Sequence, residues 1–261
     1  MRYSIAQDAR PQIKLLIAAT VVSILLWIVG WYLPLAGYIV YPLQLFATFI
    51  HEGGHVLASI LTGSPVQSLT VSPDASGEVY STGSGWLASL FISSAGYLGT
   101  TAFGAALLAW IRFGRSSRLA LYISGFTVAL LTVVFGILAP VWNLFANVTF
   151  TKFGFTILSG ALISAGLLAI ARFANLKWVN FAAAFLAIQC LLNAMFSLAE
   201  LFVIAGFSNV HSDAANMQAA TGIPGVVWAV IWIGLSLFLI SVGMRLYAVG
   251  KTTKTDSVFE D

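Results

Sequence analysis

Two histidines and a glutamate stand at a spacing that can bind a metal ion and use it. Residues 51–55 read His-Glu-Gly-Gly-His. Residues four apart on a helix lie on one face, so His51 and His55 can bind one metal ion together. Glu52 is the next residue round the helix and can act as a base toward water. This is the H-E-x-x-H arrangement, in which two imidazoles hold zinc beside a carboxylate base.

The residues around this motif are apolar. Between Tyr38 and Gly63 the chain has no Lys, Arg or Asp, and Glu52 is its only acidic residue. Ionisable groups at membrane depth are costly and mark a functional site by default. The alternative is a hydrogen-bonded polar cluster between helices, but without a metal it would bury three ionisable groups at a high cost. We therefore expect a metal site here.

A third protein ligand is needed, because catalytic zinc usually has three protein ligands and one open position. Within the apolar body the candidates are Glu200, His211 and Asp213. Asp74 and Glu78 lie in a polar loop and are weaker candidates. The spacing of these residues leaves the third ligand open.

Each of the three candidates also has a second interpretation. Asp213 can be the N-cap of a short helix over 214–220. We expect His211 to lie behind a ligand or to contact substrate rather than to bind the metal. Glu200 can orient a metal ligand or lie neutral at the membrane interface.

The composition is that of an all-α polytopic membrane protein. The chain is 59% hydrophobic and 8% charged, with a mean hydropathy of +0.94, whereas soluble domains carry about 25% charged residues. The net charge of +3 is ordinary for basic loops beside a membrane and predicts no nucleic-acid partner. About seven transmembrane helices are expected, and the first should be retained rather than cleaved as a signal peptide. The segments are 14–33, 38–62, 86–112, 118–139, 154–172, 178–205 and 225–248.

We expect one integral membrane domain over residues 1–261. Its metal-site core should lie in 38–112 and 205–248, with a disordered polar tail over 249–261. A β-hairpin should follow the histidine helix directly, because short β-prone runs in 66–82 flank a turn-forming cluster, Pro73-Asp74-Ala75-Ser76-Gly77.

Charge gives a contradictory orientation if there are seven spans. The side with the N-terminus carries four basic residues, namely Arg2, Arg10, Lys14 and Lys152. The other side carries eight, namely Arg112, Arg115, Arg118, Arg172, Lys177, Arg245, Lys251 and Lys254. The positive-inside rule favours the second side as cytoplasmic, whereas the basic N-terminus argues against it. A miscounted or re-entrant segment would remove the conflict.

These features together resemble the site-2 protease family of intramembrane zinc metalloproteases. The resemblance rests on HEGGH in an apolar helix, a Gly-containing hairpin after it, and a distant aspartate near a later span. The pieces Ser72–Gly77, Ser94–Gly99, Ser212–Ala214 and Thr221–Pro224 are similar to a compact bacterial and plant branch, and the likeness covers about 38–110 and 205–245. The aspartate here stands in Ser-Asp-Ala, where the family usually has Asn-Pro-Asp-Gly or Leu-Asp-Gly.

The resemblance implies a site and an activity. It implies that His51, His55 and Asp213 bind one Zn²⁺ ion and that Glu52 activates water. The implied function is intramembrane endopeptidase, acting on a transmembrane protein substrate in the lipid bilayer of a bacterial cell membrane. The alternative is a metal-binding membrane scaffold or assembly factor without proteolysis. A site that only binds zinc has no use for the base Glu52, which favours the enzyme.

Overall fold

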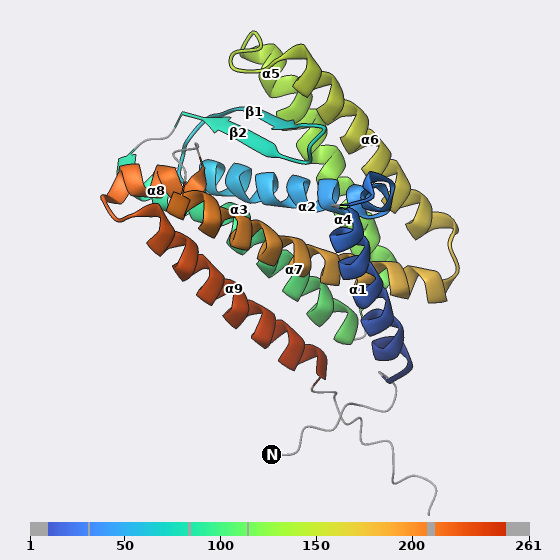
Figure 1. The fold of residues 1–261 in the computed structure, drawn as a ribbon. Helices are drawn as coiled ribbons and strands as arrows, with labels where there is room; N and C mark the ends of the chain where they lie inside the picture. The colour runs from blue at the N-terminus through green and yellow to red at the C-terminus, as the bar shows by residue number, and fades with distance from the viewer. Residues whose placement is uncertain (1–9, 31, 83–84, 114, 208–211, 249–261) are drawn as a thin grey trace, which may run out of the picture.

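The computed structural model describes residues 10–30, 32–82, 85–113, 115–207 and 212–248. The predictions made for His211 and for the tail 249–261 lie outside these residues. Figure 1 shows a helical bundle with one small hairpin. In chain order its elements are α1 (Arg10–Gly30), α2 (Pro34–Leu61), β1 (Val66–Val71), β2 (Gly77–Ser81), α3 (Gly85–Arg112), α4 (Ser117–Leu131), the π-helix η1 (Thr132–Leu138), α5 (Ala139–Trp142), α6 (Phe150–Phe173), α7 (Leu176–Phe207), α8 (Asp213–Thr221) and α9 (Gly225–Ala248).

The chain is an integral membrane protein, but the predicted count of seven spans is not confirmed. Among the described residues, five helices are long and apolar enough to cross a membrane: Gly85–Arg112, Ser117–Trp142, Phe150–Phe173, Leu176–Phe207 and Gly225–Leu246. Within the residues of α1 that could be searched, the apolar stretch Ile17–Leu26 is shorter than a span. The 28-residue α2 does not qualify, because the HEGGH motif and Gln44 interrupt its apolar run.

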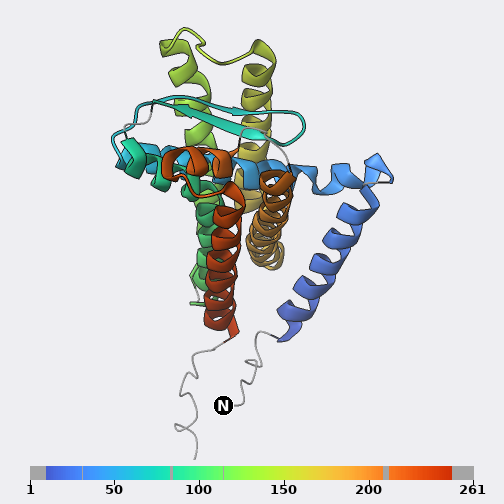
Figure 2. The same cartoon turned by 60° about the vertical axis from the view of Figure 1, so that its left-hand side comes forward.

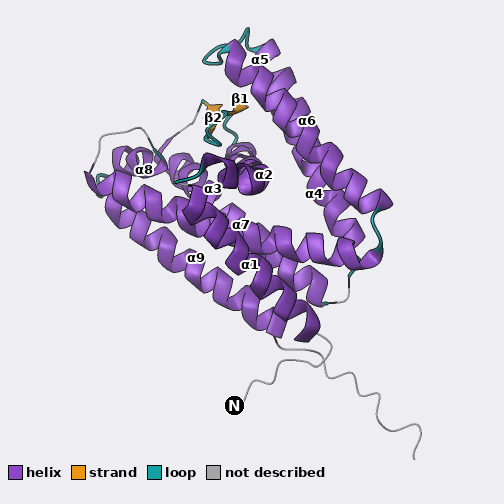
Figure 3. Cartoon of the chain, turned by 45° about the vertical axis from the view of Figure 1, so that its right-hand side comes forward, coloured by secondary structure: helices purple, strands orange, loops and turns teal. Residues whose placement is uncertain are grey.

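The helix α2 lies across the bundle rather than along it. In Figure 2 it runs sideways over the upper ends of α3 and α9, and in Figure 3 it is seen nearly end-on while α6 and α9 lie in the plane of the view. The hairpin lies along α2. Thr48 Oγ1 donates to the Ala75 carbonyl at 2.7 Å and Tyr41 Oη donates to the Pro73 carbonyl at 2.6 Å. The histidine helix and the hairpin therefore form a layer at one end of the bundle.

The predicted hairpin is present. The strands β1 and β2 are antiparallel, with Leu69 opposite Val79 and Val71 opposite Gly77. At the turn, Asp74 Oδ1 accepts hydrogen bonds from the backbone and side chain of Ser76. These two bonds lower the pKa of the Asp74 carboxyl below its usual range. The carboxylate is thus ionised at neutral pH and closes the turn as an acceptor.

One strand of the hairpin is buried and the other faces the site. Residues 68–71 of β1 are buried, whereas β2 is partly exposed along its length. The backbone N–H of Val71 donates to Thr156 Oγ1 of α6 at 2.8 Å in a buried position. On the other side, Lys152 at the start of α6 pairs with Glu78 of β2 at 2.8 Å. The helix α6 thus fixes both strands relative to α2.

Small residues bring the long helices close together, as is usual in membranes. A Cβ at Gly104 of α3 would lie 2.9 Å from the Ala187 carbonyl oxygen of α7. A Cβ at Gly243 of α9 would lie 2.8 Å from Ala105 Cβ of α3. The helix α3 is therefore packed between α7 and α9, and its first half carries residues against the histidines.

Candidate metal centre

Three side chains from two distant elements converge on one point. The Nε2 atoms of His51 and His55 are 3.0 Å apart. Asp213 Oδ2, from the first residue of α8, lies 3.6 Å from His51 Nε2 and 3.3 Å from His55 Nε2. Among the described residues, this is the group of His, Cys, Asp and Glu side chains that can hold a metal ion. The structure thus brings together the three predicted ligands.

The triangle of donor atoms has the size that zinc requires. Ligand atoms about 2.0–2.1 Å from a tetrahedral zinc ion are about 3.3 Å from one another. The three distances here bracket that value. Two imidazole nitrogens and one carboxylate also form a donor set that suits zinc and leaves a fourth position open.

His55 is held in the tautomer that a metal ligand needs. Its Nδ1 lies 2.6 Å from the backbone carbonyl oxygen of Ile92 in α3. A carbonyl oxygen can only accept, so Nδ1 carries a proton, and Nε2 is the ring nitrogen that faces the site. A partner behind the ligating histidine is the usual way in which a metal site fixes ring orientation.

His51 is positioned by aromatic packing. The Tyr97 ring of α3 meets it edge-on, with the ring centroids 4.5 Å apart. Tyr97 in turn stacks on Trp232 of α9 at 5.6 Å, and Trp232 Nε1 donates to Ser94 Oγ at 3.0 Å. Trp232 is buried, so the imidazole rests on a column that continues into the bundle core.

Glycines make room for the ligands and for the base. A Cβ at Gly96 of α3 would lie 2.4 Å from His51 Nε2 and 2.5 Å from His55 Nε2. A Cβ at Gly54 would lie 2.2 Å from the Ala95 carbonyl oxygen, so Gly54 lets α2 and α3 touch backbone to backbone. The geometry thus gives Gly54 a role in close helix packing.

Glu52 is buried beneath the hairpin, next to the ligands. A Cβ at Gly77 of β2 would lie 2.3 Å from Glu52 Oε1. Glu52 also lines the same cavity as the three predicted ligands. The backbone of β2 therefore covers the carboxylate, and a larger residue at 77 would displace it.

Asp213 is free to act as a ligand because its neighbour caps the helix. Ser212 is the N-cap of α8, and its side chain accepts a hydrogen bond from the Ala215 N–H. The alternative role of Asp213 as N-cap is thus wrong. Burial raises the pKa of the Asp213 carboxyl, but the adjacent His55 and His51 imidazoles lower it more, to below the usual range. The group is ionised, as a metal ligand must be.

The metal centre opens into a cavity of about 1180 Å³. Its walls come from α2, β2, α3, α7 and α8. Glu200, predicted to support a ligand or to lie at the interface, lines this cavity and is exposed. The hairpin residues Asp74 and Glu78 line it as well, outside the ligand group. A cavity of this size can take an extended peptide segment.

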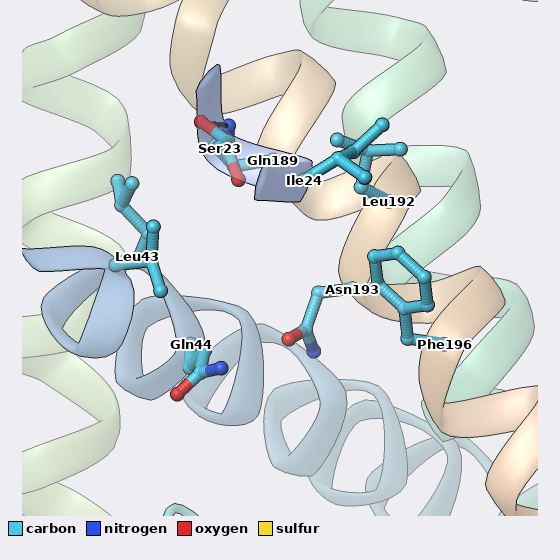
Figure 4. A pocket seen from close by; sticks show the side chains of 9 residues that line it. Ser23, Ile24, Leu43, Gln44, Gln189, Leu192, Asn193 and Phe196 are labelled. Carbon is cyan, nitrogen blue, oxygen red and sulfur yellow. Dashed lines mark hydrogen bonds between the residues drawn. The ribbon is translucent and has the colours of Figure 1, made fainter. Parts of the chain in front are cut away.

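A small and mostly apolar cavity with a few amide and hydroxyl groups adjoins the larger one. It has about 20 Å³ of space between α1, α2 and α7, and Gln44, Asn193 and Phe196 line both cavities. In Figure 4 the amides of Gln44 and Asn193 point toward one another, while Gln189 Nε2 donates to Ser23 Oγ at 2.8 Å. Polar groups thus continue from the metal centre toward α1.

Several residues of the site were not identified from the sequence. Tyr97, Trp232 and Gly96 lie in apolar segments, where nothing in their spacing marks them as part of a metal site. Gly77 was assigned to the turn. Only Ser94–Gly99, which carries part of the family resemblance, indicated that this stretch of α3 bears on the site.

Comparison with known proteins gives one match. The family described as Peptidase M50B-like matches residues 16–243. This range includes His51, Glu52, His55 and Asp213 and every described helix from α2 to α8. No curated protein and no solved structure matches the chain.

Proposed function

Because the chain belongs to the Peptidase M50B-like family, a site-2 protease family, we propose that it is an intramembrane zinc endopeptidase. Its substrate would be a transmembrane protein, cut within or near the membrane. The observation that carries this proposal is the convergence of His51, His55 and Asp213 at 3.0–3.6 Å beside the buried Glu52.

The residues of the chain have distinct roles in this proposal. His51, His55 and Asp213 would hold one Zn²⁺ ion. When bound, zinc supplies a Lewis acid that polarises the scissile carbonyl and acidifies water. Glu52 accepts the proton of the attacking water and passes it to the leaving amine. The hairpin backbone at Gly77 lies against the Glu52 carboxylate, which is buried.

The substrate must be held in an extended form, because a helix hides its peptide bonds. The strand β2 pairs with β1 on one side only in this two-stranded sheet, and it lines the cavity. Its other edge can take up an extended segment by strand addition. The Gln44 and Asn193 amides, at the α1 side of the cavity, can satisfy backbone groups that the unwound segment exposes.

The substitution Glu52→Gln tests the proposal. Gln keeps the shape of the side chain but cannot accept a proton, and general-base assistance is worth about 10²–10⁴ in rate. We expect zinc content near one ion per chain in both proteins, with cleavage of a reconstituted single-pass membrane substrate reduced at least 100-fold. Glu200→Gln is the matched control, since it removes another carboxylate of the same cavity. It should retain most of the activity.

A second variant tests whether cleavage requires the metal ion. His55→Ala should lose both bound zinc and cleavage. Equal zinc in wild type and His55→Ala would overturn the metal site. If wild type cleaves no membrane substrate and Glu52→Gln preserves the cellular function, the chain is a metal-binding scaffold instead.

A further inference from the structure

A threonine of α6 holds the end of the hairpin strand β1. Thr156 is fully buried, as is Val71, the last residue of β1. The Thr156 hydroxyl oxygen accepts a hydrogen bond from the Val71 N–H at 2.8 Å and donates to the Lys152 carbonyl at 2.7 Å. The Val71 carbonyl oxygen lies 3.3 Å from the same hydroxyl. One side chain of α6 therefore meets both backbone polar groups of Val71.

Val71 needs this partner because the sheet offers it none. Hydrogen-bonded and non-hydrogen-bonded residue pairs alternate along two antiparallel strands. The Ser72 N–H donates to the Ser76 carbonyl at 2.8 Å. The adjoining pair, Val71 and Gly77, is therefore a non-hydrogen-bonded one, whose N–H and carbonyl groups point away from the opposite strand. A backbone group without a partner is costly in apolar surroundings, and the Thr156 hydroxyl removes that cost at the outer edge of β1.

The Gly77 backbone, opposite Val71, lies against the base of the site. A Cβ at Gly77 would lie 2.3 Å from Glu52 Oε1 and 2.6 Å from Glu52 Cγ. Non-hydrogen-bonded pairs are the closer kind, with Cα atoms about 4.5 Å apart, so a movement of Val71 is passed to Gly77. A short series of contacts thus runs from Thr156 through the hairpin to the Glu52 carboxylate.

Thr156 itself lies outside the chemistry. The lining of the metal-centre cavity, as far as the structure describes it, does not include this residue. Its methyl group is enclosed by η1 instead, since a Cβ at Gly136 would lie 3.0 Å from Thr156 Cγ2. An effect of Thr156 on the reaction must therefore pass through the hairpin.

We propose that Thr156 is a positioning residue for Glu52: its hydroxyl fixes the end of β1, and the opposite strand then holds the Glu52 carboxylate in one place beside the metal centre. The inference rests on the proposed function, in which Glu52 accepts the proton of the attacking water. Without the hydroxyl, the end of β1 shifts toward another hydrogen-bond partner and Gly77 shifts with it. The carboxylate then has room to turn, and a misplacement of about 1 Å can cost roughly 10²-fold in rate.

Two substitutions at position 156 separate the hydroxyl from the shape of the side chain. Thr156→Val keeps the shape and should cleave a reconstituted single-pass membrane substrate about ten-fold more slowly or worse. Thr156→Ser keeps the hydroxyl and should stay within about three-fold of wild type. Both should retain zinc, because the ligands lie on α2 and α8. Lys152→Met is the matched control: it removes the exposed ion pair with Glu78, one turn earlier on the same face of α6, and should change the rate less than about two-fold.

Combination with Glu52→Gln shows whether Thr156 acts through the base. In that background Thr156→Val should lower the residual rate less than about two-fold, because the group that it positions no longer accepts a proton. An equal fold-loss in both backgrounds would overturn the proposal. Loss of zinc from Thr156→Val would overturn it as well, since the damage would then extend to the ligands.

Hydrogen exchange of the β1 amides, followed by mass spectrometry, gives a readout that needs no cleavage. The Val71 amide should exchange slowly in wild type and Thr156→Ser, and about ten-fold faster or more in Thr156→Val. Unchanged exchange in Thr156→Val would contradict the proposal whatever the activities are. A wild type that cleaves no substrate but shows this difference in exchange would count against the proposed function alone, because the hold of Thr156 on the hairpin over Glu52 would stand.

Discussion

At the scale of the residue, the space around the two imidazoles depends on Gly96, which has no side chain. Gly96 leaves room for both ligating nitrogens, and its Cβ would lie 2.4–2.5 Å from them. The rings cannot easily move away, because His55 is bonded to the Ile92 carbonyl and His51 is packed on Tyr97. The donor triangle therefore depends on glycine at 96.

We predict that Gly96→Ala weakens zinc binding about 10–100-fold, the range typical when support of metal ligands is lost. Gly99→Ala, one turn along α3, is the control, because its Cβ would meet Gly54 Cα at an ordinary 3.5 Å. Metal content after dialysis against a graded chelator compares the two. Equal zinc retention would mean that the histidines can shift without losing the ion.

At the scale of the element, the two strands of the hairpin differ: β1 is buried, and β2 lines the cavity. Leu69 of β1 is fully buried against the core, whereas its cross-strand partner Val79 lines the cavity. A side chain at 79 can thus reach a bound peptide, and one at 69 cannot. Both lie in the β-prone runs that predicted the hairpin, and only the fold distinguishes them.

We therefore expect a cysteine at 79, and not one at 69, to cross-link to a substrate helix. Val79→Cys in the Cys190→Ser, Glu52→Gln background should form a disulfide with a cysteine placed near the scissile bond of the substrate. Leu69→Cys is the matched control. Cross-linking from 69 that equals cross-linking from 79 would contradict binding of substrate along β2.

At the scale of the whole molecule, α3 holds the site together because it touches both flanking helices. Its first half carries Ile92, Gly96 and Tyr97 to the ligands, while its second half packs on α7 and α9 through Gly104 and Ala105. Loosening that packing should therefore affect stability and the metal site together.

Gly104→Leu should destabilise the bundle by about 1–3 kcal/mol through overpacking. For a chain of this size that lowers the unfolding midpoint by roughly 3–10 °C. Gly166→Leu adds the same side chain where nothing lies within 4 Å of the new Cβ, and it should have little effect. Thermal unfolding in detergent, with zinc content measured alongside, checks both. A normal midpoint for Gly104→Leu would show that α3 and α7 can separate without cost.

The sequence alone predicted the chemistry and determined the class of fold. The spacing of His51, Glu52 and His55 on a helix predicted the metal motif, and β-prone runs around a turn predicted the hairpin. Both could be predicted because each depends only on residues that are close in the sequence. Apolar composition likewise specifies a helical membrane protein. The family resemblance added Asp213, and the converging geometry of the three side chains is consistent with it.

Only the tertiary structure decided how these parts are arranged. Apolarity along one segment does not give the direction of a helix relative to its neighbours, and only the fold shows that α2 lies across the bundle. The supports at Tyr97, Gly96 and Trp232 come from α3 and α9, far from the HEGGH motif in sequence. Their roles arise from contacts between distant segments, and no spacing within one segment encodes such contacts.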